Sequence, residues 1–271
     1  RALEELGAPG LETATITRAP RAGQRLVDAY GRALVAEAAR NRDIVALDAD
    51  LLKDCGLAEF AKRFPERLVE CGIAEQDMVS QAGGLALRGM LPVVHSFACF
   101  LSARPNEQIY TNATERTKIV YVASLAGLLP ATPGHSHQAV RDISALGAVP
   151  GLAMLAPATE RETEAAVEWC LHRAEQSCYL RLCSVPTPIP FETPGKIEAY
   201  RGSILHEGLD AVIYAYGPVM LTQAYEAAKL LQERGIGLRV INLPWLNRVD
   251  ADWLAATALP RVFTLDDHYI H

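Results

Sequence analysis

A single carboxylate at the start of an apolar segment is the feature of this sequence best suited to chemistry. Behind Glu75, small and apolar residues recur at helical spacing from Met78 to Leu85. The plainest role for Glu75 is electrostatic, because a negative charge in a first turn complements the helix dipole. A carboxyl in an apolar setting can instead stay protonated near neutral pH and donate a hydrogen bond. Ile73, Ala74 and Met78 are expected to supply that setting.

Further polar and aromatic side chains follow the ends of predicted strands. Asp48 and Asp50 end one apolar run, Phe97 ends another, and His135 and His137 lie in the loop after a third. The carboxyl ends of parallel strands meet at one edge of a sheet, where binding sites of such folds lie. The sequence therefore predicts that these residues gather near Glu75.

Apolar runs rich in Ile and Val alternate with amphipathic segments over much of the chain. This alternation predicts an α/β fold with a doubly wound, mostly parallel sheet and helices on both faces. The predicted helices cover 25–41, 57–64, a segment that starts at Glu75, a segment through Gln108, a segment near Ala139, and 160–173. The predicted strands are DIVALDAD, LVEC, PVVHSF, KIVYVA, LAMLA and CYLRLC.

Composition divides the chain into four parts. Residues 1–20 read as an N-terminal arm and 21–185 as the first domain. The proline-rich segment 186–199 reads as a linker, and 200–271 as a smaller α/β domain with a helix at 219–234. The second domain looks like about half of a unit, so we expect the polypeptide to continue beyond His271.

Overall composition excludes several classes of protein. The 271 residues are 50% hydrophobic with a net charge of -6, and no Lys/Arg run could neutralise a track of phosphates, so nucleic acid is not expected as a partner. No apolar run approaches the roughly 20 residues of a membrane span, and the N-terminus lacks the features of a signal peptide. The six cysteines have no CxxC spacing, which favours reduced thiols in a cytoplasmic protein over disulfides or a metal site.

The motifs taken together resemble the transketolase family of thiamine diphosphate enzymes. The matches are DADL at 48–51, GIAEQ at 72–76, SFACF at 96–100, ARPNEQI at 103–109, and then HQ at 137–138 and LDDHY at 265–269. The resemblance implies the pyrimidine-binding fold followed by the family's C-terminal domain. GIAEQ is the most specific of these motifs, and HQ alone carries almost no weight.

The resemblance assigns cofactor roles to five residues. It implies that Glu75 hydrogen-bonds a ring nitrogen of the cofactor's aminopyrimidine and so assists formation of the ylid. Phe97 and Phe100 would pack against that ring, Asp50 would belong to the cofactor site, and Leu51 would be the apolar wedge beneath the bent cofactor. The alternatives are a core role for the phenylalanines and a turn-capping role for the aspartates.

The resemblance also implies substrate contacts. His137 would orient or protonate sugar oxygens, and Arg181 would bind the acceptor's phosphate unless it forms a surface ion pair. Val27 and Asp54 occupy positions where the family uses an arginine and a serine to contact phosphate, and a carboxylate repels a phosphate. We therefore expect an acceptor that is not an ordinary phosphosugar. His95, in an apolar strand, is expected to be a hydrogen-bonded core histidine.

The family's GDG motif, which binds the metal that holds the diphosphate, is missing from this sequence. The resemblance therefore implies that the Mg²⁺ ligands and the diphosphate site lie on a partner chain, an N-terminal-type transketolase subunit, with no metal ligand on this chain. It implies transfer of a two-carbon ketol unit from a ketose donor to an acceptor by an α2β2 heterotetramer. Open alternatives are a subunit related to deoxyxylulose-phosphate synthase or to an oxo-acid dehydrogenase beta chain, and a non-catalytic scaffold.

Overall fold

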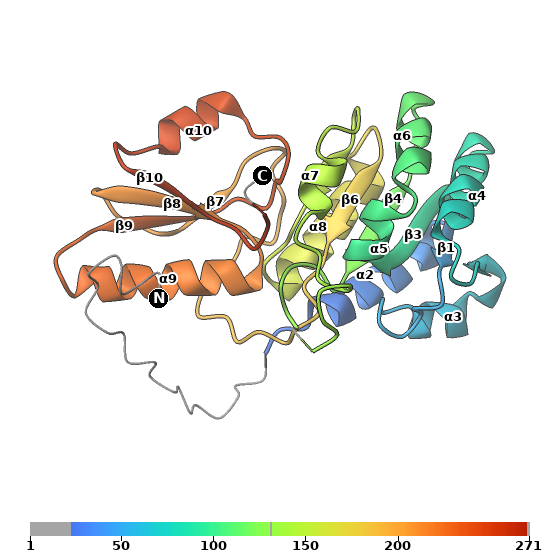
Figure 1. The fold of residues 1–271 in the computed structure, drawn as a ribbon, viewed down its shortest axis with the longest axis horizontal. Helices are drawn as coiled ribbons and strands as arrows, with labels where there is room; N and C mark the ends of the chain where they lie inside the picture. Colours follow the sequence, from blue (N-terminus) through green and yellow to red (C-terminus); the bar gives the residue numbers. More distant parts are fainter. Residues whose placement is uncertain (1–22, 131, 270–271) are drawn as a thin grey trace.

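The computed structural model describes residues 23–130 and 132–269. They form a larger α/β unit followed by a smaller one (Figure 1). The predicted arm at 1–20 lies outside the described residues.

The larger unit is built on a six-stranded sheet in which all strands run parallel. The strand order is β2-β1-β3-β4-β6-β5. Strands β1, β4 and β6 are buried along their whole length, and β3 is buried at all but its two end residues, as their apolar sequences predict. The strands are β1 (Ile44–Asp48), β2 (Leu68–Glu70), β3 (Leu91–Phe97), β4 (Val120–Ser124), β5 (Ala153–Leu155) and β6 (Cys178–Arg181).

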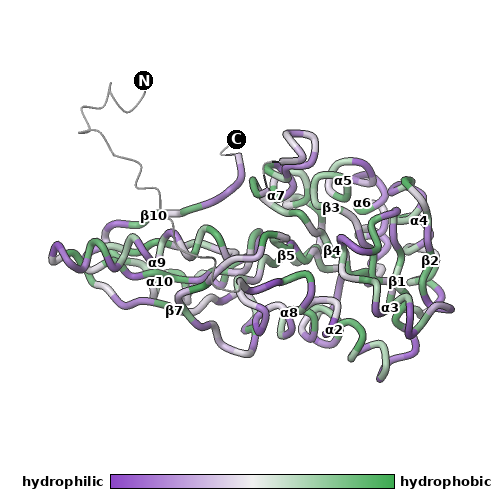
Figure 2. Tube along the Cα trace, turned by 90° about the horizontal axis from the view of Figure 1, so that it is seen from below, coloured by the Kyte–Doolittle hydropathy of each residue, from purple (hydrophilic) through white to green (hydrophobic). Residues whose placement is uncertain are grey.

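Helices cover both faces of this sheet, and Figure 2 shows the three layers from below. One face carries α2 (Leu26–Arg40), α3 (Ala58–Arg63) and α8 (Glu160–His172). The other carries α4 (Glu75–Leu87), α5 (Ala98–Ala103), α6 (Asn106–Thr114) and α7 (Asp142–Leu146), and a 3₁₀ turn, Pro65–Arg67, precedes β2.

Two separate apolar clusters fill the spaces between the sheet and its helices. On the α2 side, Tyr30 and Leu34 pack against Ala46 and Val93 of the sheet. On the α4 side, Met78 belongs to the cluster. Side chains alternate between the faces of a strand, so each strand contributes to both clusters and the sheet is fixed from both sides.

The smaller unit has a four-stranded sheet in the order β10-β8-β9-β7, in which β7 runs antiparallel to β9. Helices α9 and α10 lie on opposite faces (Figure 1). The elements are β7 (Ser203–His206), β8 (Ala211–Ala215), α9 (Pro218–Gln232), β9 (Leu238–Asn242), α10 (Ala251–Thr257) and β10 (Val262–Leu265).

The fold class predicted from the alternation is confirmed, with local differences. The helix expected through Gln108 is two helices, broken at Pro105, because proline has no amide hydrogen to donate to the preceding helical turn. The helix expected near Ala139 begins only at Asp142. The helix α10 was not predicted, although Asp250 caps it by accepting a hydrogen bond from the Trp253 amide.

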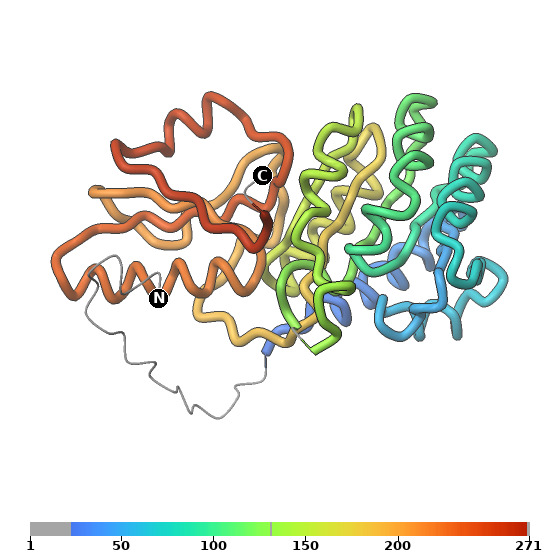
Figure 3. Tube along the Cα trace, viewed as in Figure 1, coloured from blue at the N-terminus to red at the C-terminus, as the bar shows by residue number. Residues whose placement is uncertain are grey.

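The chain passes from the larger unit to the smaller one between β6 and β7, a path that Figure 3 traces, and the two units also make direct contacts. Trp245 of the smaller unit packs edge-on against Trp169 of α8 and next to Tyr200. Backbone hydrogen bonds join Ala156 to Pro244 and Leu246 to Met154. The units therefore share a packed and hydrogen-bonded junction.

Two further expectations concern membranes and cysteines. In the two described ranges, no helix has the length and apolar character needed to cross a membrane. All six cysteines are free thiols, of which Cys55, Cys170 and Cys178 are buried and the other three are partly exposed.

Candidate functional site

The candidate site lies at the carboxyl edge of the six-stranded sheet. Glu75 begins α4 just after β2, Phe97 is the last residue of β3, and His137 lies in the loop after β4. In the sheet, β1 lies between β2 and β3, and β4 is next to β3. The parallel topology therefore collects the predicted residues at one edge, as expected from the sequence.

Glu75 is buried, with 2% of its surface exposed, but its surroundings differ from the predicted apolar setting. Its carboxylate pairs with the guanidinium of Arg104. Met78 is fully buried on the same helix, whereas Ile73 is 73% exposed and does not enclose the carboxyl. The expectation that Ile73 helps to bury Glu75 is wrong, because the loop before α4 turns that side chain to solvent.

Two phenyl rings and an imidazole form an aromatic cluster beside this ion pair. The ring centroids of Phe97 and Phe100 are 5.8 Å apart, and His137 lies edge-on at 6.1 Å and 5.2 Å from them. The guanidinium of Arg104 stacks 3.9 Å from the centroid of Phe100. A continuous set of contacts thus runs from Glu75 through Arg104 and Phe100 to His137.

His137 is held by its own loop. Its Nδ1 shares a hydrogen bond of 2.9 Å with the hydroxyl of Ser136, and its backbone amide donates to the carbonyl of Gly134. Gly134 has a φ of 79°, a region that glycine enters without strain. The imidazole is half-buried, whereas His135 is exposed.

The DADL turn lies just past the end of β1. Asp50 is exposed and has a φ of 64°, a left-handed conformation that aspartate tolerates. Leu51 is half-buried and packs against the cluster on the α2 side. Asp48, still on the strand, is fully buried, and its carboxylate accepts a hydrogen bond of 2.8 Å from the amide of Leu51.

Arg181 is buried, with 4% of its surface exposed, and already has anionic partners. Its Nε donates to Asp142 at 2.9 Å, its Nη1 lies 3.0 Å from Asp267, and its Nη2 donates to the carbonyl of Ala139 at 3.0 Å. Burial would lower the pKa of Arg181, but the two carboxylates outweigh burial and raise it. The guanidinium is thus enclosed in an ion-pair network and does not lie at the surface.

Val27 and Asp54, the two departures from the family pattern, lie on α2 and in the turn before α3. Val27 is half-buried and packs against the α2-side cluster, and Asp54 is exposed. Neither side chain provides a cationic phosphate contact.

His95 is a core histidine, as predicted, hydrogen-bonded to the hydroxyl of Tyr30 at 2.5 Å and to the carbonyl of Leu47 at 3.0 Å. Burial lowers the pKa of His95 to about 4, so it is neutral.

Sequence reasoning missed two residues of the site. Arg104 lies within the ARPNEQI segment, directly before Pro105. The only feature of the sequence that could have pointed to Arg104 is this position of a cationic residue before a helix-breaking proline. Asp142 carries no signal beyond its charge in a short helix. Its role depends on Arg181, which lies 39 residues away.

In the described part of the chain, no group of three or more His, Cys, Asp or Glu residues could hold a metal ion.

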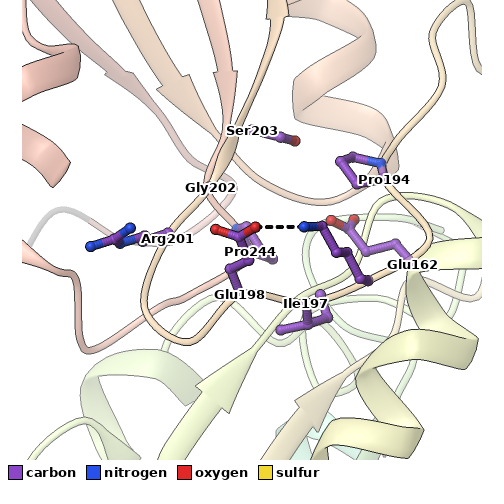
Figure 4. A pocket seen from close by; sticks show the side chains of 9 residues that line it. Glu162, Pro194, Ile197, Glu198, Arg201, Gly202, Ser203 and Pro244 are labelled. Carbon is purple, nitrogen blue, oxygen red and sulfur yellow. Dashed lines mark ion pairs between the residues drawn. The ribbon is translucent and has the colours of Figure 1, made fainter.

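A small cavity of about 110 Å³ lies away from this cluster, beneath the linker and next to the smaller unit (Figure 4). Glu162 of α8 forms part of its wall, and Lys196 pairs with Glu198 at its rim. Glu162 is 3% exposed and accepts hydrogen bonds of 2.7 Å from both the Ala158 amide and the Asn242 side chain. None of the predicted site residues lines this cavity.

Comparison with known protein families matches the larger and the smaller unit to two different family models. Residues 23–184 match the family model of the transketolase pyrimidine-binding domain, and residues 201–271 match that of the transketolase C-terminal domain.

Two relatives differ in how much of their length the chain covers. An apulose-4-phosphate transketolase subunit of Phocaeicola vulgatus is 31% identical over 235 residues, which are 85% of this chain and 75% of that protein. The 1-deoxy-D-xylulose-5-phosphate synthase of Thermomicrobium roseum is 34% identical over 86% of this chain, but the match spans only 37% of that enzyme.

A solved structure described as a split gene transketolase, an inactive beta4 tetramer, has a TM-score of 0.81 and 35% identity to this chain. The match covers 91% of this chain and 80% of the solved one. With the matches along both units and the fold described above, these findings show that the chain belongs to the transketolase family.

Proposed function

We propose that this chain is the C-terminal-type subunit of a split transketolase, which transfers a two-carbon ketol unit with thiamine diphosphate after assembly with a second chain. The observation that carries the proposal is the buried Glu75 carboxyl beside Arg104, with Phe97, Phe100 and His137 within one set of contacts. A buried acid next to aromatic faces suits a planar heterocycle with a ring nitrogen.

The residues present fit the aminopyrimidine half of the cofactor. Phe97 and Phe100 are half-buried, so both rings offer surface for stacking, and Glu75 lies at the start of α4 next to them. Asp50 and Leu51 contribute from the turn after β1. When bound, thiamine diphosphate supplies an electron sink for the carbon–carbon bond that breaks.

Each side chain has a defined task in this proposal. Glu75 hydrogen-bonds a nitrogen of the pyrimidine ring, and Arg104 pairs with the same carboxyl. Phe97 and Phe100 orient the ring and exclude water from it. His137, half-buried at the edge of the cluster, donates a hydrogen bond to an oxygen of the sugar.

A partner chain supplies the rest of the site in this proposal. The partner, an N-terminal-type transketolase subunit, binds Mg²⁺ and the diphosphate, and the active assembly is an α2β2 heterotetramer. The names of the relatives support a divided enzyme, since one is a subunit of an apulose-4-phosphate transketolase and another is a split gene product that is inactive as a beta4 tetramer.

The acceptor is proposed to differ from ordinary phosphosugars. Asp54 places an exposed carboxylate where the family uses a serine, and Arg181 is already neutralised by Asp142 and Asp267. Measuring transfer to ribose 5-phosphate and to unphosphorylated aldehydes tests this part. Turnover with ribose 5-phosphate at rates typical of the family would refute it.

The experiment for the main proposal is reconstitution with a candidate partner chain, thiamine diphosphate and Mg²⁺. Ketol transfer from a ketose is expected only when both chains are present, and Glu75→Ala should abolish it. Glu59→Ala, which removes an exposed carboxylate on α3, serves as the matched control and should leave activity unchanged. Activity that survives Glu75→Ala would contradict the catalytic role.

A second candidate is favoured by one comparison. The relative from Thermomicrobium roseum is a 1-deoxy-D-xylulose-5-phosphate synthase that matches 86% of this chain. The same Glu75 would serve that chemistry with a different donor. Turnover that depends on pyruvate and not on a ketose would favour this second candidate.

A further inference from the structure

The loop that carries the DADL turn and the loop that leads to Glu75 are joined by one carboxylate. Oε1 of Glu70, the last residue of β2, accepts a hydrogen bond of 3.0 Å from the amide of Asp50 and one of 2.8 Å from the amide of Gly72. Asp50 and Gly72 both have positive φ, 64° and 67°, so each sits at a sharp turn in its loop. One oxygen atom thus holds two turns in fixed relation.

Asp48 of β1 lies next to Glu70 in the sheet, and one of its two carboxyl oxygens is buried without a hydrogen-bond donor in the two described ranges. Its Oδ2 accepts from the amide of Leu51, but its Oδ1 is buried and has no hydrogen-bond partner among the described residues. A buried oxygen without a donor is costly if it is ionised. If Asp48 carries a proton it becomes a donor, and Glu70 is the residue paired with it across the parallel strands β1 and β2, where its carboxyl interacts with that of Asp48.

The electrostatic surroundings agree with a protonated Asp48. Burial raises the pKa of Asp48 to about 7. The Leu51 amide lowers it, whereas the adjacent Glu70 carboxylate raises it. The other titratable groups that face Asp48 are the thiols of Cys55 and Cys71, whose pKa values burial raises to about 12 and about 11.

On the neighbouring strand, His95 pairs with Asp48 in the sheet register and is neutral at physiological pH. None of these groups is a cation that could compensate two negative carboxylates.

We propose that Asp48 and Glu70 share one proton, and that Glu70, held in this way, is a positioning residue that fixes the DADL turn relative to the loop of Glu75. Loss of the shared proton would place two like charges side by side and loosen both turns. The link to the cofactor rests on the proposed function, because that function makes Asp50, Leu51 and Glu75 cofactor residues. The shared proton and its effect on the turns do not depend on that function.

The first test is a carbon-13 NMR titration of the side-chain carboxyls in the full chain. We expect one carboxyl to titrate near pH 7 in the wild type and that signal to be absent in Asp48→Asn. In Glu70→Gln the titration of Asp48 should move to lower pH, because a neighbouring negative charge is lost. The proposal is overturned if every carboxyl assigned to these two residues titrates below pH 5.

The second test is hydrogen exchange at the amides of Asp50 and Gly72. After correction for the intrinsic pH dependence, we expect protection in the wild type to fall about tenfold between pH 6 and pH 8.5. Asp48→Asn, whose amide can donate permanently to Glu70, should keep its protection at both pH values. Asp43→Asn is the matched control, an exposed carboxylate before the opposite end of β1, and should behave as the wild type.

Equal protection in the wild type and in Asp48→Asn at pH 8.5 would refute the shared proton. Neither measurement uses turnover. A failure here is therefore distinct from a failure of the proposed ketol transfer.

Discussion

At the scale of single residues, the ion pair between Glu75 and Arg104 sets the conditions under which any ligand reaches this site. Glu75 is 3% exposed at its side chain and Arg104 is 38% exposed, so the anion is the buried partner. Removal of one member of a buried pair costs more than replacement of both, because a charge is left without compensation.

A double-mutant cycle measures this coupling. Arg104→Met should lower the free energy of unfolding by about 2 kcal/mol, since it leaves Glu75 buried without its partner. Glu75→Gln combined with Arg104→Met should lose less than the sum of the two single changes, with a coupling of about 1 kcal/mol. Urea denaturation of the four proteins gives these values. Strict additivity would show that Arg104 does not stabilise the carboxylate.

At the scale of elements, the loop between β4 and α7 is the part of the site whose position depends on distant residues. It carries His137, and hydrogen bonds between the backbones of Gly127 and Ala139 close it on itself. Arg181 of β6 donates to the carbonyl of Ala139 and so attaches the loop to the sheet. Arg181 can therefore act on His137 through the backbone.

Replacement of this arginine by lysine distinguishes the two roles considered for it. Arg181→Lys keeps the charge but has no planar fork to reach Asp142, Asp267 and Ala139 together. We expect faster amide exchange at Gly127 and Ala139 and a loss of about 2 kcal/mol in the free energy of unfolding. Arg141→Lys, an exposed change in the same loop, is the control. If Arg181 instead binds the acceptor's phosphate, only the KM of phosphorylated acceptors should rise.

The elements also show what the sequence could and could not predict. The strands of the first sheet follow from unbroken apolar runs, and their order of appearance predicts the edge where Glu75, Phe97 and His137 meet. The direction of β7 could not be predicted, because SILH carries no signal that distinguishes a parallel from an antiparallel neighbour. The pairing of Arg181 with Asp142 and Asp267 was also missed, since it depends on contacts between segments far apart in the chain.

At the scale of the whole molecule, the junction between the two units contains a buried acid. Glu162 of α8 reaches Asn242 of β9, and burial raises the pKa of Glu162 from 4.5 to about 7. Because the folded-state pKa is raised, the contribution of Glu162 to stability is full below about pH 4.5 and is lost as the pH rises through 7.

The free energy of unfolding of the wild type should therefore fall by about 3 kcal/mol between pH 4.5 and pH 8 through the titration of Glu162. Each unit of pKa difference between the folded and unfolded states is worth about 1.4 kcal/mol. Glu162→Gln should remove this decline, because glutamine does not titrate in this range. The new amide keeps a partner, since the unpartnered Oδ1 of Asn242 can accept from it after a flip of the Asn242 side chain. Denaturation with urea across this pH range is the measurement, with Glu164→Gln on the exposed side of α8 as control. Parallel pH profiles for the wild type and Glu162→Gln would contradict the assignment.

The network around Arg181 has a practical consequence for protein engineering. Asp267 holds the guanidinium from the smaller unit, and the amide of Tyr269 donates to the carbonyl of Val140 at the end of the His137 loop. A chimera that exchanges only the larger unit would bring in a foreign loop without its matching counterpart. Recombination between homologous subunits should therefore transfer both units as one cassette, with the crossover placed before α2.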